Sequence, residues 1–253
     1  MESKKIGLLI LSTSNKRDNW SSIKDSYLYN LTLKTFLLTQ NKEHKYVFYI
    51  GIDPNDRIYD KENQQKEILR FSQAFKNVEF KFIKIMSVTK GHVTIMWNKL
   101  FKIAYDENCD YFFQCGDDIY FRTSNWINDC ITTLKNNNDI GITGPINNNF
   151  RILTQAFVSR KHMEIFGWFF PEEIINWCCD DWYNLVYQPS NFFPLRQHFC
   201  SNNGGEPRYI IDNNPAFKRN DLREYMSNVN NLREKTQLLA NEHKKLINNY
   251  LNK

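Results

Sequence analysis

The sequence of 253 residues lacks any long hydrophobic run. A transmembrane helix needs about 20 consecutive apolar residues, and no segment approaches that length, so the sequence predicts no membrane span. The apolar segment 6–11 follows a charged start and faintly resembles a signal peptide, but it lacks a small-residue cleavage site. We therefore interpret this segment as a first strand and expect a cytoplasmic protein.

Glycine is scarce, with nine residues in the chain, and it is missing where phosphate-binding motifs need it. The loop that follows the first expected strand, residues 12–18, contains none. A dinucleotide-dependent oxidoreductase needs G-x-G-x-x-G at this place, and a P-loop kinase needs G-x-x-x-x-G-K-[ST]. The nucleotidyltransferases that make sugar nucleotides usually carry a glycine-rich first loop as well. The sequence therefore disfavours these three enzyme classes.

The sequence also lacks cysteine pairs with metal-binding spacing, and it lacks an excess of basic residues outside its C-terminal tail. The six cysteines include no C-x-x-C pair, and we expect reduced, mostly buried thiols. The net charge is +5, but residues 218–253 hold eight Lys or Arg and four Asp or Glu, so this tail carries +4. The body is left with +1, which argues against a nucleic-acid groove.

The sequence does have an alternation of apolar strands and amphipathic helices, in a chain long enough for one large domain or a domain plus an appendage. This order predicts an α/β protein with a mostly parallel sheet covered by helices on both faces. The expected strands cover residues 6–11, 46–52, 78–85 and 111–115. The expected helices cover residues 23–38, 62–75 and about 14 residues after the segment 91–93.

The second half of the chain follows a different pattern. We expect a short strand and turn at residues 139–145, another strand at 152–160 and the start of a helix at 161–166. The segment 188–207 is predicted to be rich in loops.

Two adjacent carboxylates, Asp117 and Asp118, follow the buried strand 111–115. In parallel sheets ligands bind outside the carboxyl ends of the strands, and the loops 12–18 and 53–56 should reach the same edge. Bare carboxylates at that edge repel each other, and hard cations such as Mg²⁺ or Mn²⁺ prefer such oxygen ligands. Taken alone, the pair is equally well explained by a turn, because Asp and Gly are common turn residues.

A second acid pair, Asp180 and Asp181, lies between Trp177 and Trp182. A carboxylate at this place could take a proton from an acceptor hydroxyl, and the aromatic faces could stack on sugar rings. The alternative is an ordinary acid pair at a helix terminus.

The tail predicts a long C-terminal helix with a heptad seam about four repeats long. The seam consists of Leu222, Tyr225, Val229, Leu232, Thr236, Leu239, His243, Leu246 and Tyr250. Three interpretations stay open: a surface helix docked on its own domain, a homodimeric coiled coil, and contact of the basic face with an anionic surface.

These features together resemble glycosyltransferases of the GT-A fold. The segment Gly116-Asp117-Asp118-Ile119 is similar to their Asp-x-Asp (DXD) motif, although a strict Asp-x-Asp is not present. The segment Cys179-Asp180-Asp181-Trp182 resembles the acidic motif that houses the catalytic base in inverting members. The resemblance covers about residues 6–210 and rests on the order and spacing of the two motifs.

The resemblance implies a metal-dependent transferase that moves a sugar from a nucleotide diphosphate donor, a UDP-sugar, to a saccharide or glycoconjugate acceptor with inversion. Mn²⁺ or Mg²⁺ would be held by Asp118, with Asp117 and His198 as further ligands. Asp181, or else Asp180, would act as the catalytic base. A single His such as His198 is also often structural.

The resemblance also implies a donor-binding set and a division of the chain. Residues 1–121 would form the nucleotide-sugar-binding half, 122–217 the acceptor and catalytic-base half of the same domain, and 218–253 a helical tail. The alternatives for the donor-binding residues are loop solvation, turn formation and, for His92, a helix cap. The rival hypothesis is a non-catalytic, transferase-like protein that works through its C-terminal coiled coil. The donor-binding set is Thr13, Ser14, Lys16, Arg17, Asp53, His92 and Asp117.

Overall fold

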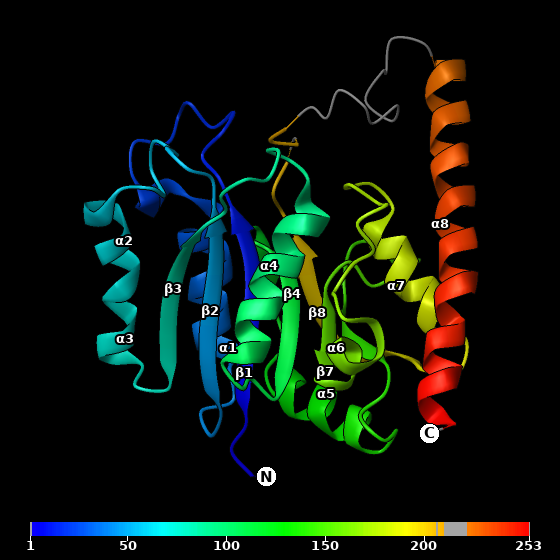
Figure 1. Cartoon of the computed structure of the whole chain (residues 1–253). Coiled ribbons are helices and arrows are strands. Elements are labelled where there is room, and N and C mark those ends of the chain that lie inside the picture. Colours follow the sequence, from blue (N-terminus) through cyan, green and yellow to red (C-terminus); the bar gives the residue numbers. More distant parts are fainter. Residues whose placement is uncertain (1, 206, 210–221, 253) are drawn as a thin grey trace.

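The computed structural model describes residues 2–205, 207–209 and 222–252, and within the last helix it describes side chains from Met226 onward. These residues build an eight-stranded sheet in the order β3-β2-β1-β4-β7-β6-β8-β5 (Figure 1). The strands are β1 (Lys5–Ser12), β2 (Lys45–Ile52), β3 (Val78–Lys84), β4 (Tyr111–Gly116), β5 (Ile119–Phe121), β6 (Ile142–Ile146), β7 (Ala156–Ser159) and β8 (Phe192–Asn202).

The sheet is mixed rather than mostly parallel throughout. Its first four strands in spatial order, β3, β2, β1 and β4, are all parallel, as the alternation of strands and helices predicts. β7 then runs antiparallel to β4 and to β6, and β5 runs antiparallel to β8, while β8 is parallel to β6. The expectation of a parallel sheet therefore holds for one half of the fold.

Helices cover both faces of this sheet because successive strand residues point to opposite sides. Leu8 and Phe113 pack in a cluster with Trp126 on one face, whereas Leu9 packs with Phe101 on the other. The helical segments are η1 (Ile23–Asp25, 3₁₀), η2 (Leu28–Leu33, π), α1 (Lys34–Thr39), α2 (Glu62–Leu69), α3 (Phe71–Ala74), α4 (Val93–Asp106), α5 (Trp126–Lys135), α6 (Lys161–Phe166), α7 (Cys179–Tyr187) and α8 (Leu222–Leu251).

The expected helix at 23–38 is divided into a 3₁₀ turn, a π-helix and an α-helix. Two threonines on these segments bind the neighbouring strand β5. The Oγ1 atoms of Thr32 and Thr35 accept hydrogen bonds of 2.9 and 3.0 Å from the backbone N–H groups of Ile119 and Phe121. The helix thus supplies the partners that a neighbouring strand would otherwise provide on this side of β5.

Two expectations for the second half of the chain are wrong in extent. Residues 188–207 were expected to be loops, yet β8 occupies Phe192–Asn202, because the run that starts at Phe192 is apolar enough to pair with β6 despite Pro194. The strand expected at 152–160 is confined to β7, because the backbone of Leu153 is bound at both its N–H and its C=O by the Asn184 carboxamide. Helix α5 was not predicted from the sequence.

All six cysteines are free thiols, five of them buried and Cys178 half-buried, as expected. Within the described part of the chain, no helix combines the length and the apolar composition that crossing a membrane requires.

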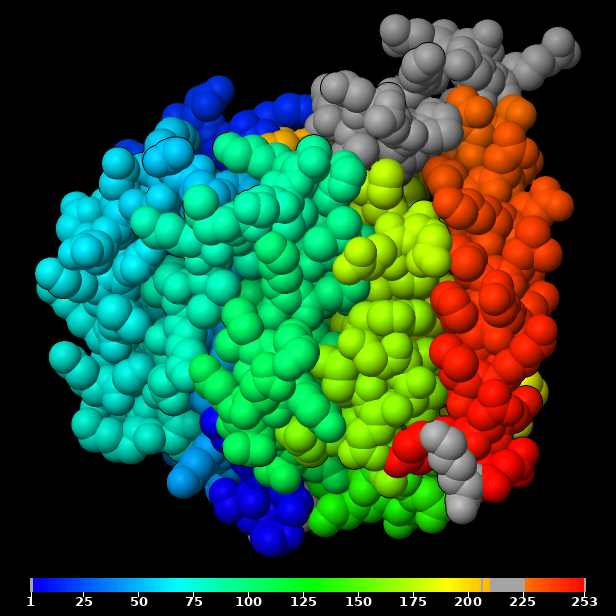
Figure 2. Space-filling view, viewed as in Figure 1, coloured from blue at the N-terminus to red at the C-terminus, as the bar shows by residue number. Residues whose placement is uncertain are grey.

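The long C-terminal helix α8 docks on its own domain beside α6 and α7 (Figures 1 and 2). Its buried face contains Val229, Thr236, Ala240 and Ile247. Most described seam positions face the domain, but Leu246 is 37% exposed and Ile247 is buried in its place. The seam positions 222 and 225 lie outside the described side chains, and the boundary expected at 217/218 lies outside the described residues. The docked interpretation is therefore what the structure shows, and homodimerisation stays a prediction.

Docking of α8 predicts a clear difference between two substitutions on this helix. Ile247→Ala should lower the free energy of unfolding by roughly 2–5 kcal/mol, because Ile247 is buried and its loss leaves a cavity. Leu238→Ala is the matched control, because Leu238 is 63% exposed and should change the free energy little. Urea unfolding of both variants measures this, and equal effects would contradict docking.

Candidate functional site

A cavity of about 530 Å³ opens at the carboxyl ends of β1 and β4. Ligands bind outside the carboxyl ends of parallel strands, and β1 and β4 are parallel, so the cavity lies where a ligand is expected. Its walls come from segments far apart in the sequence: residues 11–13 at the end of β1, 116–118 at the end of β4, 149, 151–152 and 154–155 before β7, 176–181 at the start of α7, and 202, 204–205 and 207–209 at and after the end of β8. Helix α8 adds Val229 and Arg233. Both predicted acid pairs therefore line one cavity.

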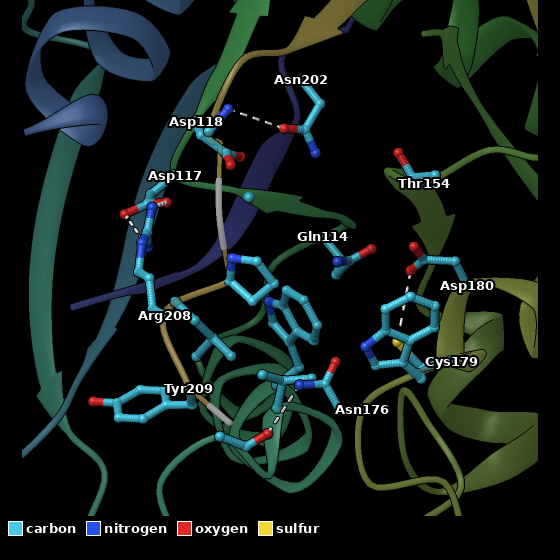
Figure 3. A pocket seen from close by; sticks show the side chains of 18 of the residues that line it. Gln114, Asp117, Asp118, Thr154, Asn176, Cys179, Asp180, Asn202, Arg208 and Tyr209 are labelled. Atoms are coloured by element: carbon cyan, nitrogen blue, oxygen red, sulfur yellow. Dashed lines mark hydrogen bonds and ion pairs between the residues drawn. The ribbon is translucent and has the colours of Figure 1, made fainter. Parts of the chain in front are cut away.

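The first carboxylate, Asp117, already has a cationic partner. Arg208 donates two parallel hydrogen bonds to it, with Nη1 to Oδ2 at 2.8 Å and Nη2 to Oδ1 at 2.5 Å (Figure 3). Asp117 is 2% exposed. Such a two-point contact between a guanidinium and a carboxylate is stronger than a single hydrogen bond, so Asp117 is held in place and its charge is balanced within the chain.

The second carboxylate, Asp118, has less compensation for its charge. Burial, followed by repulsion from Asp117, raises its pKa to about 6. Its side chain lies against Gly204, where an added Cβ atom would stand 1.6 Å from Asp118 Oδ2. The chain after β8 thus passes so close to Asp118 that only glycine fits. A carboxylate in this environment is stabilised by any cation that enters the cavity.

This close approach predicts that Gly204→Ala destabilises the fold by about 1–3 kcal/mol, because the new methyl group displaces the Asp118 carboxylate. The loss should shrink when Gly204→Ala is made together with Asp118→Gly, since the two residues are in contact. Thermal and urea unfolding of the single and double variants measure this. Asn203→Ala, at the exposed neighbour, is the control. Simple additivity of the two substitutions would contradict the contact.

A polar network lies beside the acid pair at the end of β2. Tyr209 donates a short hydrogen bond to Asp53 Oδ2, and its hydroxyl lies 3.1 Å from Thr13 Oγ1. Thr13 in turn donates to Asp56 at 2.9 Å, and Ser14 donates to Asp56 from both its backbone and its hydroxyl at 2.7 Å. Burial alone would raise the pKa of Asp56, but the hydrogen bonds from Ser14 and from the backbone N–H groups of Tyr59 and Ile58 lower it.

The predicted donor-binding residues are therefore brought together only in part. Thr13, Arg17, Asp53 and Asp117 line the cavity. Ser14 is buried against Asp56 and does not line it. The other two predicted donor-binding residues, Lys16 and His92, are also outside the lining; Lys16 is exposed with a φ of 55°, and His92 is the residue that precedes α4. Arg17 donates to the backbone oxygen of Gly204 at 3.1 Å, which ties the first loop to the segment after β8.

The two carboxylates of α7 differ although they are neighbours. Asp181 forms an ion pair with Arg151 at 2.7 Å. Asp180 accepts a hydrogen bond of 3.3 Å from the Tyr183 hydroxyl and lies 3.7 Å from the Cys179 thiol. Burial, followed by repulsion from Asp181, raises the pKa of Asp180 to about 7. One carboxylate is thus paired, and the other is poised to exchange a proton near neutral pH.

The structure does not bring His198 to this cavity. Its Nε2 lies 2.7 Å from Asp129 Oδ2 on α5, and its Nδ1 lies 3.1 Å from Thr123 Oγ1 just after β5, so both ring nitrogens face partners away from the cavity. Across residues 2–205, 207–209 and 222–252, no three His, Cys, Asp or Glu side chains are grouped so that they could hold a metal ion by themselves.

Several residues of the site were not found from the sequence. Arg208 and Tyr209 lie just after the segment that is expected to be rich in loops, and nothing in the local sequence points to Asp117 or Asp53. Arg151 neutralises Asp181 from another loop. Gln114, inside the apolar run of β4, carried the one usable signal, because a polar residue in a buried strand requires an explanation.

Comparisons with known proteins identify the fold. No family model matches the sequence, and no curated protein matches it. The structure is similar to that of residues 1–349 of S. aureus TarS, a glycosyltransferase, with a TM-score of 0.51 and 11% identity, covering 77% of this chain and 60% of that one. The TarS 1–349 structure in complex with UDP-GlcNAc gives a TM-score of 0.55 at 11% identity, covering 95% of this chain and 70% of that one. The chain therefore has a glycosyltransferase-like fold.

Proposed function

We propose that the protein is a GT-A glycosyltransferase that moves a hexosyl group from a UDP-sugar to a saccharide or glycoconjugate acceptor, by direct displacement with inversion. One observation carries the proposal: a single cavity holds the acid pair at the carboxyl end of β4 and, from α7, a carboxyl whose pKa is raised to about 7. UDP-GlcNAc bound to the structurally similar TarS supports the choice of donor.

Asp180 is the proposed base. Its raised pKa lets it accept a proton near neutral pH, whereas Asp181 is engaged by Arg151. The acceptor oxygen attacks the anomeric carbon, the bond from that carbon to the diphosphate oxygen breaks, and the acceptor proton passes to Asp180. Tyr183 orients the Asp180 carboxylate through its hydroxyl. This choice reverses the order expected from the sequence, in which Asp181 came first.

The donor end of the cavity fits a divalent cation with Asp118 as its protein ligand. Mg²⁺ is usually held by one or two carboxylates together with substrate phosphates, so a third protein ligand is not required. The raised pKa of Asp118 indicates that its negative charge is poorly compensated, so a cation beside it would stabilise the charged form. A bound Mn²⁺ or Mg²⁺ would neutralise charge on the departing diphosphate. Arg208 balances the charge of Asp117 at the same place, which leaves the charge of Asp118 for the metal.

The proposal is tested by titrating the protein with UDP, UDP-glucose, UDP-galactose and UDP-GlcNAc, with and without Mn²⁺, in calorimetry and thermal unfolding. We expect a UDP-sugar to bind and to raise the melting temperature in a metal-dependent way. GDP-mannose and CMP-sialic acid serve as control donors. If none of the UDP compounds binds, the proposed function is wrong.

A further inference from the structure

The floor of the cavity contains a polar side chain that the proposed mechanism does not use. Gln114 lies on β4, opposite Leu9 of β1 and Ala156 of β7. Strand alternation puts Gln114 on the same side as Phe112 in the core and Gly116 beside the acid pair. The Gln114 residue is 1% exposed and lines the cavity.

The Gln114 carboxamide is incompletely satisfied. Its Oε1 is buried and has no hydrogen-bond partner among the described residues. The Ser12 hydroxyl lines the same cavity at the end of the neighbouring strand β1. It too is buried and has no hydrogen-bond partner among the described residues. A buried polar atom without a partner destabilises a fold, and an apolar side chain of the same size would avoid this cost. Such an atom beside a cavity is accounted for if a ligand completes its hydrogen bonds.

The location of Gln114 indicates which part of a ligand it would meet. In Figure 3 its carboxamide lies between the acid pair, Asp117 and Asp118, and the carboxylate of Asp180, and all four residues line one cavity. If the diphosphate lies at the acid pair and the acceptor hydroxyl at Asp180, the transferred sugar ring occupies the space between them. That space has Gln114 at its floor.

We propose that the Gln114 carboxamide hydrogen-bonds a hydroxyl group of the donor sugar and is thereby a specificity-determining residue; this inference rests on the proposed function. The sugar hydroxyl donates to the amide oxygen, or accepts from the amide N–H₂ after rotation of the carboxamide. A site that binds a hydroxyl through a buried polar group rejects an analogue that lacks the hydroxyl, because the group is then left unpaired.

The test compares ligands with and without the sugar on the whole 253-residue chain. Gln114→Met keeps the length of the side chain and removes its polar atoms. We expect its affinity for the best UDP-sugar to fall about 10- to 100-fold in calorimetry, whereas its affinity for UDP stays that of the wild type. The melting temperature of Gln114→Met without ligand should be unchanged or higher, since the unpaired oxygen is gone.

Deoxy donors identify the hydroxyl. Among monodeoxy analogues of the UDP-sugar, one should bind the wild type more weakly, and Gln114→Met should no longer distinguish that analogue from the parent donor. Gln40→Met is the control, because Gln40 is buried outside the cavity and its replacement should not change ligand affinity. Unchanged affinity of Gln114→Met for the UDP-sugar, or an equal loss for UDP, would overturn the inference. A wild type that fails to bind UDP would overturn the proposed function and this inference with it.

Discussion

Asp180→Asn should lower kcat by about 10²- to 10⁴-fold, the usual contribution of a general base, with little change in UDP affinity. The wild-type kcat/KM should rise with pH and level off above an apparent pKa of about 7, because Asp180 must be deprotonated to accept the proton. In Asp180→Asn this pH dependence should disappear. Release of UDP from the donor in the presence of acceptor, measured between pH 5 and 9, checks both results.

Asp181→Asn is the matched control on the same helix. It removes the ion pair with Arg151 but leaves Asp180 in place, and it also removes the negative neighbour that helps to raise the pKa of Asp180. We therefore expect a kcat within about tenfold of the wild type and a pH profile shifted to lower pH. A large loss in Asp181→Asn together with a small loss in Asp180→Asn would return the role of base to Asp181.

Asp118→Asn should remove the dependence of UDP-sugar binding on Mn²⁺. Loss of groups that only support a metal ligand already costs 10- to 100-fold in metal affinity, so loss of the ligand itself should cost more than about 100-fold. In the wild type, protons compete with the metal for Asp118, so metal-dependent binding should weaken as the pH falls below about 6. Calorimetry with Mn²⁺ and the UDP-sugar, between pH 5 and 8, measures both effects.

The stability of Asp118→Asn shows whether the loss of metal dependence comes from loss of the ligand or from unfolding of the variant. The pKa of Asp118 is higher in the folded than in the unfolded state, so its contribution to stability falls as the pH rises towards 6. Above that pH, Asp118→Asn should be at least as stable as the wild type without metal. Asp117→Asn, which leaves the half-buried Arg208 beside a neutral amide, should be less stable. Loss of metal dependence in Asp117→Asn alone would reverse the two assignments.

The place of the acid pair could be predicted because it depends on local pattern. An apolar run long enough for a strand, repeated after each helix, determines that Asp117 and Asp118 lie at the carboxyl edge of the sheet. The same reasoning failed in the second half. Pro194 and the polar residues that follow it hid β8, and strand direction reverses from β6 to β7 without a helix between them.

The remaining features of the site depend on contacts that no local pattern encodes. Arg208 reaches Asp117 across 91 positions, and Tyr209 reaches Asp53 across 156. The choice between Asp180 and Asp181 depends on which of two adjacent, half-buried helix positions meets Arg151, and neighbours on a helix point about 100° apart. His198 was predicted from its position in the order of motifs, but the register of β8 directs it towards Asp129.

The docking of α8 makes the cavity sensitive to local opening. Trp182 on α7 donates to His243 on α8 at 3.1 Å, and Lys235 donates to the backbone oxygen of Glu173 just before α7. Helix α7 also carries Asp180, so undocking of α8 removes the support of the proposed base. The amides of α7 and α8 should therefore exchange hydrogen with solvent as one cooperative unit, more slowly when a UDP-sugar is bound.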